Sequence, residues 1–184
     1  MTVSRFSGAL LACAAMLATP AIAGQANPRV GGAAMLPSKN IVENAVNSRD
    51  HTTLVAAVKA AGLVETLSGP GPFTVFAPTN AAFAKLPAGT VDTLVKPENK
   101  AQLTTILTYH VVPGTMTSKD IAKAIKDGGG KATLTTVQGE PLTASMMGRT
   151  LMLTDAKGGM SHVTIADVRQ SNGVIHVVDT VLMP

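Results

Sequence analysis

The hydrophobic residues of this chain follow a helical period in its first two thirds. Apolar side chains recur every three or four residues, the spacing that places them on one face of a helix. Polar and glycine residues punctuate these segments, and Gly62 is placed to stop one helix in the left-handed conformation. Ser38 is expected to cap a first helix, with apolar positions Ile41, Val42, Ala45 and Val46, and Asp50 or Thr52 to cap a second that ends at Gly62. The other predicted helices are Asn80–Leu86, Thr90–Val95, Glu98–Tyr109 and one capped by Ser118 that continues through Lys126.

The period changes to two in the last third, which predicts strands. An earlier segment, Phe73–Ala77, is aromatic and β-branched and also predicts a strand, ended by Pro78 with Thr79 capping the next helical turn. The final apolar run follows the tight-turn dipeptide Asn172-Gly173 and predicts a strand buried on both faces. The late strands are Lys131–Val137, Pro141–Met147, Thr150–Thr154, His162–Ala166 and Val174–Val178. Helices first and strands later predict a single α+β domain.

The first residues have the features of an export signal. Met1–Phe6 carries one positive charge, Gly8–Ala18 is an uncharged apolar run, and Ala21-Ile22-Ala23 fits a signal-peptidase site. The apolar run is shorter than the roughly 20 residues of a membrane-spanning helix. We therefore expect residues 1–23 to be a secretory signal peptide cleaved after Ala23, and 24–37 to be a flexible leader.

A second interpretation of the amino terminus is a lipoprotein signal. Leu10-Leu11-Ala12-Cys13 resembles a lipidation box, with Cys13 as the modified residue. The apolar stretch before Cys13 is very short, and apolar sequence continues to Ala23, so ordinary cleavage is favoured. Cleavage there removes the only cysteine, and the mature domain must then be stabilised without a disulfide.

Charge and aromatic content exclude some functions. Without residues 1–23, 14 Lys and Arg face 11 Asp and Glu, a net charge of +3, because only Arg5 is removed. This is less basic than a typical nucleic-acid-binding domain. The chain has no Trp and Tyr109 is its only Tyr, so it lacks aromatic residues on which bases stack.

Three motifs resemble the signature of the fasciclin (FAS1) domain family. Thr74–Phe83, with its Phe-Ala-Pro-Thr-Asn core, is similar to the first box, and Gly173–Pro184, with Gly-Val-Ile-His-Val-Val-Asp, is similar to the second. Tyr109-His110 stands between them, as the family's Tyr-His pair does. The resemblance covers 38–184 and is strongest to short secreted bacterial members with one domain. It implies a β-sandwich-like wedge of about seven strands with helices packed against it.

The resemblance also implies an exported binding module that acts in cell adhesion or surface interaction, usually without enzymatic activity. The residues agree with this expectation. Gly128–Lys131 superficially resembles a phosphate-binding loop, but Ala132 stands where a magnesium-binding Ser or Thr is needed. The histidines have no metal-ligand spacing, and no nucleophile elbow is present. We therefore expect no enzyme activity, no cofactor and no resident metal.

Tyr109-His110 is the first candidate binding site, because the resemblance links this pair to integrin binding in animal members. The local pattern favours a structural role instead. Leu103, Ile106, Leu107 and His110 continue one apolar stripe of a helix. A neutral imidazole on that stripe is expected to form a hydrogen bond with a backbone group at the helix end.

Lys119, Lys123 and Lys126 are the second candidate site. Their spacing places them on one face of the helix after Ser118, with Lys131 nearby. Such a stripe suits an anionic polysaccharide or lipid headgroup. The simpler interpretation, a solvated helix face, is favoured on the pattern alone.

The third candidate is a group of methionines, Met146, Met147, Met152 and Met160, close to His162. Thioethers in an exported protein suit copper(I), because soft sulfur matches that ion. Neighbouring residues on a strand point to opposite faces, so core filling is the favoured interpretation. An apolar patch here would instead meet a hydrophobic ligand or partner.

The sequence thus predicts a secreted or periplasmic binding module whose partner is a surface protein or glycan. The second hypothesis is a carrier of an apolar small molecule such as a lipid or carotenoid, since some relatives in the family hold carotenoids. A metal-binding role ranks third.

Overall fold

The computed structural model of the protein describes residues 27–184. The predicted signal peptide and Cys13 lie outside the described residues. Within them, no helix is both long and apolar enough to cross a membrane.

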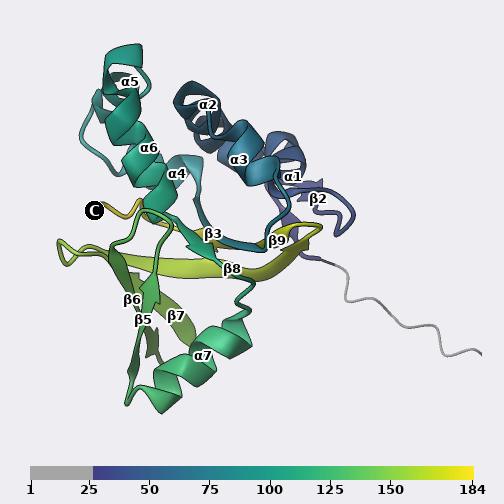
Figure 1. The fold of residues 1–184 in the computed structure, drawn as a ribbon, viewed down its shortest axis with the longest axis vertical. Helices are drawn as coiled ribbons and strands as arrows, with labels where there is room; N and C mark the ends of the chain where they lie inside the picture. Colours follow the sequence, from purple (N-terminus) through teal and green to yellow (C-terminus); the bar gives the residue numbers. More distant parts are fainter. Residues whose placement is uncertain (1–26) are drawn as a thin grey trace, which may run out of the picture.

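One mixed sheet organises the molecule, with seven strands in the order β4-β3-β9-β8-β7-β6-β5. β3 and β9 are parallel neighbours, and the other neighbouring strands are antiparallel. The strands are β3 (Phe73–Pro78), β4 (Val111–Pro113), β5 (Lys131–Thr135), β6 (Pro141–Met147), β7 (Thr150–Thr154), β8 (Met160–Gln170) and β9 (Gly173–Val178). Figure 1 shows β3, β8 and β9 across the middle of the molecule, with β5–β7 below them.

The sheet bends until its two edges approach each other. The N–H of Val137, just after β5, donates to the carbonyl of Val111 in β4 at 2.7 Å. The strands therefore form a nearly closed wedge. This confirms the α+β prediction of a wedge of about seven strands with helices packed against it.

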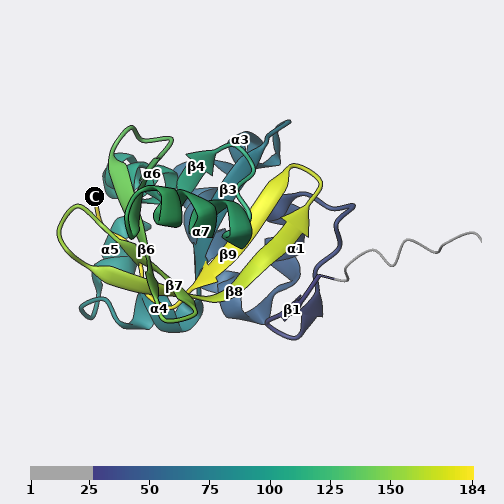
Figure 2. The same cartoon turned by 90° about the horizontal axis from the view of Figure 1, so that it is seen from below.

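Most helices lie on one side of the sheet, above it in Figure 1, while α7 lies alone on the other side. Seen from below in Figure 2, α7 crosses in front of the strands. The helices are α1 (Ile41–Asn47), α2 (Thr52–Ala61), α3 (Val64–Ser68), α4 (Asn80–Ala84), α5 (Thr90–Leu94), α6 (Lys100–Tyr109) and α7 (Ser118–Asp127), with 3-10 turns at Arg49–His51 and Pro97–Asn99.

The core has two parts, separated by β3 and β9. Val75 and Ile175 face the helices above the sheet. Phe76 and Val178 face the interior of the wedge, together with Ile121 of α7. Every residue of β9 is buried, as its two-sided apolar pattern predicts.

Two predicted helix caps are wrong by one or two residues. Asn40, not Ser38, caps α1, and Thr117, not Ser118, caps α7; each forms a capping box with an acidic residue three positions later. The acid decides the position, because Glu43 and Asp120 reach back to the cap's own N–H. Val46, one of the apolar positions of the first predicted helix, is exposed.

The predicted residues at the end of α2 and at the start of α4 are confirmed, and the predicted start of α2 is corrected. Gly62 ends α2 with φ +74°, and Thr79 caps α4 by accepting from the N–H of Ala82. α2 begins at Thr52, and its entry has no side-chain cap of the predicted Asp50 or Thr52 type.

The segment predicted as a flexible leader is folded in its described part. Two-residue strands, β1 (Arg29–Val30) and β2 (Ala33–Ala34), pair in antiparallel fashion. Val30 and Met35 are buried among the helices above the sheet. The prediction of flexibility was wrong here, because these apolar residues complete a core that is only assembled in three dimensions.

Candidate functional site

Tyr109 and His110 are buried at the carboxyl end of α6. The imidazole bridges two backbone groups: Nδ1 lies 2.8 Å from the carbonyl oxygen of Ile106, and Nε2 accepts from the N–H of Leu182 at 3.0 Å. Nδ1 therefore carries the proton of a neutral ring. The predicted hydrogen bond from His110 to a backbone group at the helix end is confirmed.

The surroundings keep His110 neutral. Burial lowers its pKa from 6.5 to about 4, and the hydrogen bond to Ile106 and the charge of Asp155 offset this only in part. The neighbouring Tyr109 is equally well satisfied, because its hydroxyl donates to the carbonyl of Pro141 and accepts from the N–H of Ala156, both at 3.1 Å. Neither side chain is exposed to a partner in this structure.

The other buried histidines are held separately. His176 stacks on Phe76 with ring centroids 5.6 Å apart, and its Nε2 lies 2.9 Å from the carbonyl oxygen of Met116. His51 contacts the hydroxyl of Ser48 through Nδ1 at 2.9 Å. Across 27–184, no three or more His, Cys, Asp and Glu side chains are grouped to hold a metal ion.

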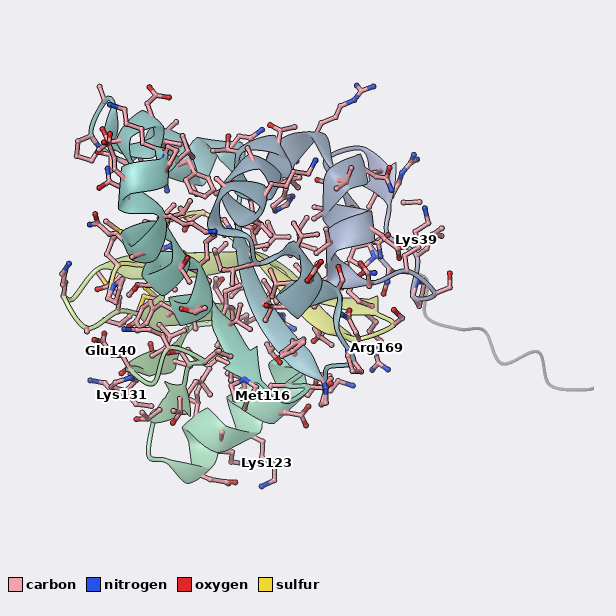
Figure 3. All side chains as sticks on the ribbon, turned by 45° about the horizontal axis from the view of Figure 1, so that its top comes forward. Lys39, Met116, Lys123, Lys131, Glu140 and Arg169 are labelled. Atoms are coloured by element: carbon pink, nitrogen blue, oxygen red, sulfur yellow. The ribbon has the colours of Figure 1, made fainter. Side chains whose placement is uncertain are left out.

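The three predicted lysines are exposed on α7. Ile121 and Ile125 of this helix are buried against the sheet, so the opposite face carries Lys119, Lys123 and Lys126. Lys123 forms an ion pair with Asp127 at 2.6 Å, and both side chains are well exposed, so this contact contributes little to stability. Figure 3 shows Lys123 projecting away from the sheet.

The amino end of α7 is fixed to β8. Asp167 accepts hydrogen bonds from the backbone N–H of Ser118, at 2.6 Å, and from its hydroxyl. Asp167 adopts φ +59° at an irregularity of the β8–β9 pairing, which turns its carboxylate toward the helix. The lysine face is therefore held rigidly relative to the sheet.

Two grooves adjoin this end of α7 and share Thr117 and Arg169 in their lining. One, of about 500 Å³, runs along Pro70–Pro72 and the β8–β9 turn. The other, of about 460 Å³, is lined by Lys119 and Asp167 as well. Arg169 thus adds a cation beside the lysine face. The sequence alone does not place Arg169 there, because 50 residues separate it from Lys119 and no local motif links them.

An apolar cavity lies between α1–α3 and β3. It encloses about 50 Å³ and is lined mainly by aliphatic side chains, among them Leu54, Val58 and Ile175. His51 also lines it, and its Nε2 has no hydrogen-bond partner of normal geometry among the described residues. Burial lowers the pKa of His51, and the backbone of Ala77 and the charge of Asp50 oppose this shift.

The methionines are not core residues, which corrects the favoured interpretation. Met146, Met147 and Met160 are 40%, 55% and 56% exposed, and Met152 is partly buried. The inner side of this sheet region is already filled by leucines and by α7, so the methionine positions face solvent or the edge of the wedge.

The comparisons with known proteins agree with the fold and its motifs. The family model of the Fasciclin domain matches residues 49–184. The chain therefore belongs to the fasciclin domain family, whose members are in general non-enzymatic domains of the adhesion type.

Relatives are found in bacteria and in animals. Protein sll1483 from Synechocystis is 50% identical over 157 residues, covering 84% of this chain and 79% of its own length. Immunogenic protein MPB70 from Mycobacterium bovis is 39% identical and spans 76% of this chain and 66% of its own. Cell surface glycolipoprotein MPB83 from the same species is 38% identical, covering 84% and 64%.

A solved structure shares the fold. The FAS1 domain pair of the insect cell adhesion molecule Fasciclin I superimposes with a TM-score of 0.70 at 19% identity. The match covers 79% of this chain and 51% of that one. One domain of that pair therefore corresponds to nearly all of the described chain.

Proposed function

We propose that this protein is an exported binding module that attaches to an anionic polysaccharide of a cell surface or matrix through the exposed face of α7. The observation that carries the proposal is the exposure of Lys119, Lys123 and Lys126 on one rigidly anchored helix. Of the five candidate residues, only these are accessible to a large partner. The relative named a cell surface glycolipoprotein supports a location at the cell envelope.

The chemistry of the surface suits a chain of repeated negative charges. At the helical rise of about 1.5 Å per residue, Lys123 lies about 6 Å and Lys126 about 10 Å along the helix axis from Lys119. A linear polyanion can follow this spacing. Arg169 extends the cationic surface into the grooves beside Lys119. Binding of this kind weakens steeply with salt, because the contacts are exposed.

The test is retention on immobilised heparin, a sulfated polysaccharide, at low ionic strength. The variant Lys119→Gln/Lys123→Gln/Lys126→Gln should elute at clearly lower salt than the wild type. The matched control Lys59→Gln/Lys96→Gln/Lys100→Gln removes three exposed lysines, from α2, from the bend after α5 and from α6, and leaves the same net charge. Equal elution of the two triple variants would refute the α7 site, since only total charge would then matter.

A second candidate function, the carriage of an apolar small molecule, is supported by the apolar cavity between α1–α3 and β3. At about 50 Å³ it is smaller than the roughly 150 Å³ cavity that admits benzene in an engineered protein. A lipid or carotenoid therefore requires α1–α3 to move away from β3.

The test of this second function is direct. The chain has no Trp and one Tyr, so the purified protein alone is nearly transparent above about 300 nm. A native preparation from the source cells that is coloured, or that releases a lipid into organic solvent, would support the carrier function. A colourless preparation with no extractable lipid would contradict it.

A further inference from the structure

The outer face of β7 and β8 gathers two thioethers and an imidazole. Strand register places Met152 directly opposite His162, and Thr154 directly opposite Met160. Met160 and His162 are two residues apart on β8 and therefore share a face. The alternate residues on both strands, Leu151, Leu153, Ser161 and Val163, are buried on the inner face. Met152, Met160 and His162 consequently point to the same, outer side.

Their separations suit a single small ion. Opposite residues of an antiparallel pair have Cβ atoms about 5 Å apart, and diagonal ones about 7–8 Å. Met152 is opposite His162 and diagonal to Met160. A methionine side chain has three rotatable bonds between its backbone and its terminal methyl group, so it can swing its sulfur toward a shared centre. Two sulfurs and one ring nitrogen can thus meet without any movement of the strands.

The ring of His162 lies beside a carboxylate. Its Nδ1 lies 3.4 Å from Oδ2 of Asp179, directly after β9. Asp179 is fixed in turn, because its Oδ1 accepts from the backbone N–H of His162 at 2.8 Å and from the hydroxyl of Thr180 at 3.0 Å. A carboxylate at Nδ1 is the usual partner of a metal-binding histidine, since it selects the tautomer whose Nε2 is free to bind. The side chain of His162 is 37% exposed, so an ion can reach it from solvent.

The exposure of the methionine has no explanation in packing. Met160 is 56% exposed on a strand where a β-branched or polar residue would be expected. Thioethers with an imidazole form a soft donor set, which favours copper(I) over zinc, magnesium or calcium. This environment differs from that of His110 and His176, whose ring nitrogens contact neighbouring protein groups.

We propose that Met152, Met160 and His162 form a copper(I) site on the outer face of the β7–β8 pair, with Asp179 as the positioning residue of the histidine. The site is distinct from the α7 surface and does not depend on it. Met146 is not a ligand, because its register partner Leu151 is buried on the inner face.

The experiment is anaerobic competition for copper(I), supplied as its acetonitrile complex, against the chromophoric chelator bicinchoninate. The wild type should withdraw one equivalent and bleach the chelator. Met152→Leu, Met160→Leu and His162→Gln should each weaken binding at least about tenfold. Met146→Leu is the matched control and should bind as the wild type does.

A second measurement, nuclear magnetic resonance of the methionine methyl groups, identifies the ligands directly. Silver(I), a redox-inert substitute for copper(I), should shift the methyl resonances of Met152 and Met160 and leave that of Met146 unchanged. The three ligand variants should keep the thermal stability of the metal-free wild type, because their side chains are at least partly exposed. The proposal is overturned if the wild type leaves the chelator fully coloured, or if the ligand variants compete as well as Met146→Leu.

Discussion

The neutral, buried imidazole of His110 should make the stability of this domain fall in mild acid. The ring connects the end of α6 to the carboxyl-terminal segment through Ile106 and Leu182. A proton added to Nε2 would abolish the acceptor for the N–H of Leu182 and place a charge in a fully buried position. The perturbation we consider is His110→Gln, which removes the titrating group.

The magnitude follows from the two pKa values. The pKa of His110 is about 4 in the folded protein and returns to 6.5 when the chain unfolds. As pH falls, the unfolded state therefore binds the proton first. The stabilising contribution is complete above pH 6.5 and is lost between pH 6.5 and 4. At 1.36 kcal/mol per pKa unit the full loss is about 3 kcal/mol, of which about 2 kcal/mol is gone near pH 5.

The assay is urea denaturation followed by far-UV circular dichroism, since the chain has no Trp for fluorescence. His110→Gln should be less stable than the wild type at pH 7.5, because buried backbone groups lose their partner. Between about pH 7.5 and 5 the free energy of unfolding should decrease in both proteins, and the decrease should be about 2 kcal/mol smaller in His110→Gln than in the wild type. Burial also lowers the pKa values of His51 and His176, and their effects are shared by both proteins and cancel in the comparison.

One result would refute the reasoning. If His110→Gln shows the same pH dependence as the wild type, His110 does not enter the linkage, and its burial or its lowered pKa is wrong. The partly exposed His162, changed to Gln, serves as the control for histidine removal itself and should be as stable as the wild type at pH 7.5.

Three further changes test the scaffold, each by thermal denaturation. Thr79→Ala removes the cap of α4 and should cost about 1 kcal/mol, so an unchanged Tm would contradict the cap. Tyr109→Phe leaves the N–H of Ala156 without its acceptor and should cost about 1–3 kcal/mol; a variant as stable as the wild type would contradict that hydrogen bond. Gly173→Ala places a Cβ 2.0 Å from the carbonyl oxygen of Phe73, so we expect little folded protein. A Tm equal to that of the wild type would show that the parallel strands β3 and β9 are not this close.

The predicted elements agree with the structure wherever the signal is local. A helix satisfies its hydrogen bonds within a few residues, so periodicity and caps such as Thr79 and Gly62 identify its extent. α3 and the β1–β2 hairpin were missed because each is too short to show a period. β8 is longer than predicted, since its irregularity near Asp167 interrupts the alternation.

The candidate sites also divide into features that follow from local sequence and features that depend on tertiary structure. The burial of His110 could be predicted, because it continues the apolar stripe of α6. The exposure of Lys119, Lys123 and Lys126 follows from the strong polarity of one helix face. Arg169 could not be assigned to that surface, since its place beside Lys119 depends on how β8 and α7 meet.

By itself, the sequence determined the class of each long element, the two fasciclin boxes and the buried character of β9, because these follow from local hydrogen bonding and from apolar patterning. Tertiary structure alone decided which side of each late strand is covered. α7 and apolar side chains fill the inner side of β6, β7 and β8, and that leaves Met152, Met160 and His162 together on the outer side of β7 and β8. Alternation along a strand separates two faces but does not say which one the rest of the chain will cover, and for that reason the sequence alone favours a core role for the methionines.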